Sequence, residues 1–210
     1  MTSNKMASQE STAQLPQRRY HSFVDFAQDE IDGIGFIVPQ QVYVHFRPDI
    51  PLEEQWRKNR PPPINFKING RLGISILEAL QLDYQPYKEL RLAPVPKEYH
   101  HSAPLQVDRG YVIRIQWPGW TPYSSKRSEV PFNIQLASDL KFLIIRIART
   151  IQQFLEKPTE HLEGQWNGWD NIEKFKKNLD KVYLLRLVSV SALTWQPVLA
   201  VEDKVFMPQS

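Results

Sequence analysis

The sequence predicts an α+β fold, in which a mainly antiparallel sheet is packed by one long amphipathic helix and two shorter helices. Several segments in which apolar and polar residues alternate follow one another directly, as the strands of an antiparallel sheet do. Between residues 140 and 155 the apolar residues instead recur at intervals of three and four, which is the spacing of a long amphipathic helix. A doubly wound parallel fold would need a regular alternation of strands and helices, which this chain lacks.

The first 20 residues differ in composition from the rest of the chain. They are rich in Ser, Thr, Gln and Asn and hold almost no large apolar side chains. Burial of apolar surface therefore cannot offset the entropy that these residues would lose on ordering. We expect a disordered polar tail over residues 1–20 and a single globular α+β domain over residues 21–210.

The first expected strands lie on either side of a charged, proline-rich loop. Large apolar residues occupy alternate positions from Gln41 to Phe46, which predicts a strand with one buried face. A second alternating run, over residues 64–68, leads into Asn69-Gly70, a dipeptide that favours a tight turn. We expect a strand and a turn there.

A short helix and the clearest strand follow. Ser75 and Glu78 have the spacing of a capping box, which predicts a short helix from about Ser75 to Leu82. Residues 111–117 alternate strictly, and the pattern predicts a strand with four large side chains on its buried face. Those side chains are Tyr111, Ile113, Ile115 and Trp117.

The long helix and the second short helix are each preceded by a candidate cap. Ser138 is a candidate N-cap of the long helix, and Lys157-Pro158 is expected to end it. Asp170 and Glu173 repeat the spacing of the capping box and predict the second short helix.

Two strands close the sequence. Residues 182–190 are nearly all apolar, as in a strand buried on both faces. Residues 193–201 form the last expected strand, and Pro197 within it favours an edge position because proline has no backbone N–H to donate.

Composition excludes several kinds of protein and favours none. The absence of cysteine excludes disulfides, thiolate metal sites and cysteine nucleophiles, and it favours the cytoplasm or the nucleus. No apolar run approaches the roughly 20 residues that cross a bilayer, so we expect no membrane association. A net charge of +3, with an isoelectric point near 9.0, is too weak to indicate nucleic-acid binding by itself.

The sequence QWPGWTPY, residues 116–123, lies in a segment that has basic and aromatic residues but no acidic ones. The basic residues are Arg109, Arg114, Lys126 and Arg127, and the aromatic residues include Trp117, Trp120 and Tyr123. Such a mixture could bind single-stranded nucleic acid, since aromatic rings stack on bases and cations pair with phosphate. The alternation instead favours a buried Trp117, a turn at Pro118-Gly119 and a Trp120 that covers the edge of the core.

A second pair of tryptophans, Trp166 and Trp169, has the same spacing of three around a glycine. Tryptophans on a loop can stack on a sugar or a base, or they can fix the start of the following helix by packing on it. Both interpretations stay open, and the second is favoured.

No motif in the chain indicates catalysis, a metal or a cofactor. The nucleophile-elbow, zinc-protease, phosphate-loop and dinucleotide patterns are all missing, so no cofactor is expected. His100, His101 and Asp108 are the only clustered polar candidates for an active site. Adjacent histidines on a strand point in opposite directions, which disfavours a zinc site.

Three segments carry a resemblance to a known family. They are the strand and turn ending in Trp117-Pro118-Gly119-Trp120, the helix 140–155 with Ile147-Ala148-Arg149 at its centre, and the late strand 191–199. Over residues 64–201 the chain resembles a family of uncharacterised proteins of mushroom-forming fungi, in which an aromatic residue follows Trp-Pro-Gly. The resemblance implies a single domain of intracellular, fungal origin and brings no established activity.

Our leading hypothesis is a non-catalytic interaction domain that binds a protein partner through exposed aromatic loops around Trp120 and Trp169. The candidate binding residues are Arg109, Arg114, Trp117, Trp120, Tyr123, Lys126, Arg127, Trp166 and Trp169. The alternatives are a single-stranded nucleic-acid binder that uses residues 109–127 and an enzyme whose pocket carries no recognisable motif.

Overall fold

The computed structural model describes residues 20–22, 30–31, 34–43, 63–68, 70–82, 111–126, 137–164, 166, 168–191 and 193–202. Residues 1–19, nearly all of the expected tail, lie outside these ranges, as do residues 44–46 of the first expected strand. The described part confirms the α+β class with a mainly antiparallel sheet, one long helix and shorter helices around it.

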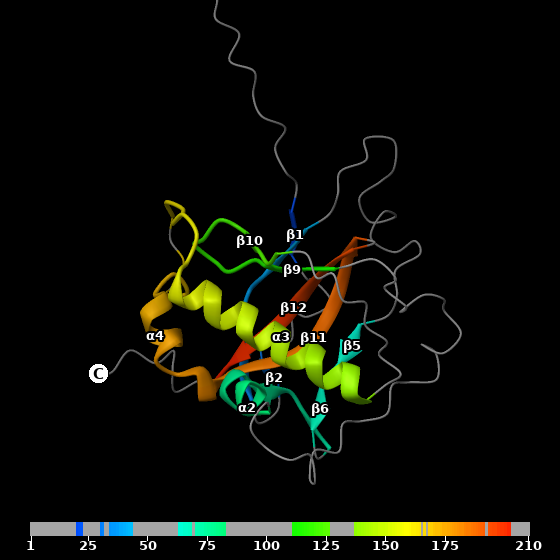
Figure 1. Cartoon of the computed structure of the whole chain (residues 1–210). Helices are drawn as coiled ribbons and strands as arrows, with labels where there is room; N and C mark the ends of the chain where they lie inside the picture. Colours follow the sequence, from blue (N-terminus) through cyan, green and yellow to red (C-terminus); the bar gives the residue numbers. More distant parts are fainter. Residues whose placement is uncertain are drawn as a thin grey trace, which may run out of the picture.

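The centre of the main sheet is the antiparallel hairpin of β11 (Val182–Ser191) and β12 (Thr194–Val201) (Figure 1). The other strands of this sheet are β2 (Glu30–Ile31), β3 (Gly35–Ile37), β5 (Ile64–Asn65), β8 (Ile74–Ser75), β9 (Val112–Ile115) and β10 (Tyr123–Ser124). β9 and β3 pair with the free edge of β12, and β5 and β8 pair with the free edge of β11. β10 extends the sheet beyond β9, and β2 extends it beyond β3. Of the strand pairs in the described ranges, β9 with β12 is the parallel one.

Two small two-stranded sheets complete the described strands. β1 (Tyr20–Ser22) pairs with β4 (Gln41–Tyr43), and β6 (Lys67–Ile68) pairs with β7 (Arg71–Leu72). The single strand expected over residues 64–68 is therefore divided. Its first half pairs with β11, whereas its second half turns away at Phe66 and forms a hairpin through Gly70.

The position of Pro197 corrects the prediction of an edge strand. β12 lies between β11 on one side and β9 and β3 on the other, so it is central to the sheet. Pro197 is opposite Leu187 of β11. On the other edge, β9 pairs with residues 194–195 and β3 with residues 200–201, so Pro197 falls between the two ladders. Neither ladder needs a backbone N–H at that position, which is how a central strand accommodates proline.

The long helix α3 (Ala137–Glu156) lies across one face of this sheet (Figure 1). It begins one residue before the expected cap Ser138, and it ends directly before Lys157-Pro158, as predicted. Its apolar side is buried against the sheet and against α2 (Ile76–Gln81) and α4 (Ile172–Lys176). Burial of each large aliphatic side chain stabilises the fold by about 1.5–3 kcal/mol, and the fully buried α3 side chains include Ile144, Ile147, Ala148, Ile151 and Phe154.

The two predicted capping boxes have different outcomes. At α2 the Ser75 hydroxyl accepts the Glu78 backbone N–H at 3.1 Å, and the Glu78 carboxylate accepts the Ser75 N–H at 3.0 Å. This box is confirmed. The box expected at Asp170 and Glu173 is wrong, because the N-cap of α4 is Asn171 and no side chain caps the helix.

The opposite face of the sheet carries a smaller apolar cluster. It is formed by Ile34, Leu185, Val188, Val198 and Ala200, with Tyr183 packed beside them. The Tyr183 hydroxyl donates to Glu202 Oε1 at 2.7 Å. Burial, and then the hydrogen bond to this carboxylate, raise the pKa of Tyr183 to about 12. The two faces thus differ, and the candidate site belongs to the face that α3 covers.

Candidate functional site

The two tryptophan pairs form turns of the same geometry. The Trp120 backbone N–H donates to the Trp117 carbonyl at 3.1 Å, and Gly119 between them has φ +82°. In the second turn the Trp169 N–H donates to the Trp166 carbonyl at 2.9 Å, and Gly168 has φ +81°. Glycine suits both positions because its lack of a Cβ permits a positive φ. The turn expected at Pro118-Gly119 is confirmed.

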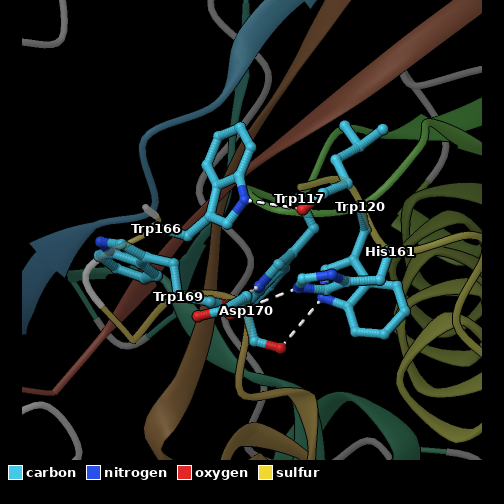
Figure 2. A network of polar contacts seen from close by, with 7 residues as sticks. Trp117, Trp120, His161, Trp166, Trp169 and Asp170 are labelled. Atoms are coloured by element: carbon cyan, nitrogen blue, oxygen red, sulfur yellow. Dashed lines mark hydrogen bonds and ion pairs between the residues drawn. The ribbon is translucent and has the colours of Figure 1, made fainter. Parts of the chain in front are cut away.

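The two turns lie against each other, as Figure 2 shows. The Trp117 indole Nε1 donates to the Trp169 carbonyl at 2.7 Å, and the Trp120 Nε1 donates to the Asp170 carbonyl at 3.1 Å. A methyl group at Gly119 would lie 2.7 Å from the Asp170 Cβ and 3.1 Å from the Trp166 ring. The glycine therefore also allows the second turn to approach this closely.

A third segment, the chain that leaves α3, joins the first turn. The Leu162 N–H donates to the Gly119 carbonyl at 2.7 Å, and the Thr121 N–H donates to the Glu160 carbonyl at 2.9 Å. The Thr159 hydroxyl also donates to the Thr121 carbonyl. Since Pro158 cannot continue the helix, the chain is free to pair with the turn immediately after α3 ends.

Aromatic packing anchors these turns to the core near the end of α3. Trp117 is 2% exposed, and its ring centroid lies 4.9 Å from that of Phe175 on α4 and 6.1 Å from that of Phe154 on α3. The Trp169 ring stacks on Phe175 with an interplanar angle of 10°. Trp169 thus packs on the helix that follows it, as the favoured interpretation of the second pair expects.

We call this site the tryptophan cluster and define it as Trp117, Trp120, Tyr123, His161, Trp166, Trp169 and Asp170. Trp120, Tyr123, Trp166 and Trp169 are each only partly buried, and Leu162 beside them is 37% exposed. The Trp166 Nε1 donates to the Leu162 carbonyl at 3.0 Å. The indole N–H groups of Trp117, Trp120 and Trp166 therefore all donate to carbonyls of the same chain.

His161 and Asp170 are the polar side chains of the cluster. His161 Nε2 lies 3.3 Å from Asp170 Oδ2, and the imidazole meets the Trp120 ring edge-on, with centroids 5.0 Å apart. These contacts hold His161 between a carboxylate and an indole. No pattern in the sequence points to His161, and its offset of nine positions from Asp170 matches no motif spacing.

The predicted basic and aromatic segment, 109–127, is divided by the sheet. Arg114 alternates with the buried Ile113 and Ile115, so it points to the face of the sheet opposite α3 and away from Trp117. Lys126 is exposed beyond β10, where its carbonyl accepts a hydrogen bond from Arg146 on α3. Arg109 and Arg127 lie outside the described residues, as do the active-site candidates His100, His101 and Asp108.

The described ranges contain neither a metal-binding cluster nor a membrane-spanning helix. No group of three or more His, Cys, Asp or Glu side chains there could hold a metal ion. No helix within the same ranges is both long enough and apolar enough to cross a membrane.

No protein-family model, curated protein or solved structure matches the chain. The resemblance to the fungal family therefore stays a prediction.

Proposed function

We propose that the chain is a non-catalytic interaction domain that binds a protein partner at the tryptophan cluster. The observation that supports this most directly is the convergence of three separate segments, residues 117–123, 158–162 and 166–170, into one hydrogen-bonded aromatic surface. The few residues that contribute most of the binding energy at protein interfaces are enriched in tryptophan, tyrosine and arginine. A surface already held by hydrogen bonds loses little conformational entropy when a partner binds.

The partial exposure of the aromatic side chains supports binding over a purely structural role. Trp117 alone fills the core position, since it is buried between Phe154 and Phe175. Trp120, Tyr123 and Trp166 stay partly exposed around it, although the molecule buries many smaller apolar side chains completely. The centres of protein interfaces are enriched in aromatic residues, and this surface has the same composition, with fixed aromatic rings and Leu162 at their edge.

The surroundings of His161 favour binding over catalysis. Its Nε2 contacts a carboxylate, and its ring contacts the indole of Trp120. In a nucleophilic triad the histidine would instead link the carboxylate to a hydroxyl or thiol. We assign His161 a positioning role, in which it supports the Trp120 ring.

The test uses two exposed apolar residues, Leu162 at the cluster and Phe142 on α3, which are 37% and 66% exposed. Each is replaced separately by the photo-crosslinking amino acid benzoylphenylalanine in the full-length protein, and the cells of origin are irradiated. We expect position 162 to crosslink to a defined partner and position 142 to yield no such product. Identical product patterns from both positions, or no product from position 162, would contradict the proposal.

A further inference from the structure

The segments that form the tryptophan cluster have a charge opposite to that of the whole chain. Residues 116–125 and 158–171 contain Glu160, Glu163 and Asp170 and no lysine or arginine, which gives 0 − 3 = −3 with neutral histidine. The whole chain has a net charge of +3. Glu160 and Glu163 are exposed, and Asp170 has a side-chain exposure of 35%. The exposed aromatic rings therefore lie in a locally acidic region.

Lysines border this region along the chain. Lys126 and Lys157 follow β10 and α3, and the lysines of α4 begin at Lys174. Lys176 pairs with Glu173 of its own helix at 3.3 Å. Lysines therefore flank the acidic segments along the chain, and such alternation of charge can give a charged partner a defined position.

The indole hydrogen bonds restrict what the rings can recognise. A proline-rich ligand that docks on an aromatic groove presents carbonyl oxygens, and these need a donor such as an indole N–H. The N–H groups of Trp120 and Trp166 already donate to the Asp170 and Leu162 carbonyls. The remaining ring surface attracts cations, because the faces of aromatic rings carry partial negative charge.

We propose that the partner presents a basic segment, in which an arginine or lysine side chain lies against the exposed rings of Trp120 and Trp166 and pairs with Glu163 or Glu160. This inference rests on the proposed function and names the chemistry of its partner. Arginine fits both contacts, since its planar guanidinium stacks on aromatic rings and pairs with carboxylates. The same acidic surface repels the phosphates of a nucleic acid.

A peptide titration tests the chemistry. The probes are two fluorescent octapeptides, one of alternating arginine and glycine and one of alternating glutamine and glycine, and the readout is fluorescence anisotropy. We expect the arginine peptide to bind at least about tenfold more tightly than the glutamine peptide. Equal binding of the two peptides would overturn the inference.

Charge reversal locates the binding site. Glu163→Arg changes an exposed side chain outside the core, and Asp180→Arg is the matched control, because Asp180 is also exposed but lies in the 3₁₀ helix Leu179–Lys181. We expect Glu163→Arg to weaken binding of the arginine peptide by about tenfold. Asp180→Arg should change the affinity for this peptide less than twofold. Equal effects of the two variants would assign the binding to general surface charge and overturn the inference. Circular dichroism melting curves of both variants verify that the fold is intact.

Combining Glu163→Arg with the crosslinker at position 162 separates this inference from the proposed function. Loss of the crosslinked partner supports both, provided that the arginine peptide binds the unmodified protein. If the partner is crosslinked as strongly with Glu163→Arg as without it, the inference of a basic segment is wrong. The proposed interaction domain is then still supported. No crosslinked partner at all overturns both proposals.

Discussion

The two tryptophan turns have the same local geometry but different surroundings. Both have two tryptophans three residues apart, a closing backbone hydrogen bond and a glycine with φ near +80°. Gly119 lies against Asp170 and the Trp166 ring, whereas a methyl group at Gly168 would have no atom within 4 Å. A local motif therefore determines the shape of a turn, while packing against distant residues determines how much substitution the turn tolerates.

Trp117→Ala should have the largest effect, because Trp117 is the buried anchor of the first turn. We expect the free energy of unfolding to fall by about 4 kcal/mol, from the cavity beside Phe154 and Phe175 and the lost hydrogen bond to Trp169. Trp166→Ala is the matched change in the second turn and should cost less than half as much, since Trp166 is only partly buried. Urea unfolding followed by circular dichroism measures both values, and equal losses would remove the distinction between the turns.

Gly119→Ala should have the next largest effect. We expect the free energy of unfolding to fall by about 3 kcal/mol. Alanine is unfavourable at a positive φ, and the added methyl group would displace Asp170 and Trp166. The same unfolding experiment measures it. A loss of only about 1 kcal/mol would mean that the second turn moves aside easily, and the two turns would then not form a rigid surface.

Gly168→Ala should have a smaller effect than Gly119→Ala. The added methyl group meets no neighbour, so we expect only the strain of the positive φ, about 1 kcal/mol. Gly168→Asn should cost less still, because asparagine tolerates this backbone region better than alanine. If Gly168→Ala and Gly119→Ala lower the free energy of unfolding equally, then backbone strain, and not close packing, dominates at both turns.

The sequence predicted features that depend on neighbouring residues better than features that depend on distant ones. Ser75 and Glu78 form the expected capping box because both partners lie in one helical turn. Asp170 and Glu173 have the same spacing, yet the Asp170 carboxylate pairs with His161 and its carbonyl accepts from Trp120. Long-range contacts that no local pattern encodes thus replaced the predicted cap.

The same limit applies to the candidate site. The alternation over residues 111–117 predicted a buried Trp117, and Pro118-Gly119 predicted the first turn. That the turns meet depends on the path of α3 between them, and that β12 is central depends on the partners of its two edges. Neither follows from the residues around Trp117 or Pro197 alone.

The hydrogen bond from Trp117 to Trp169 joins residues 52 positions apart, and the whole of α3 lies between them. Closing so long a segment is entropically costly until the helix has packed on the sheet, so we expect this contact to form late in folding. For the same reason the C-terminal turns of α3 and the two tryptophan turns should open together in the native protein. A bound partner would then slow amide hydrogen exchange in this part of α3 as well as at the surface it touches.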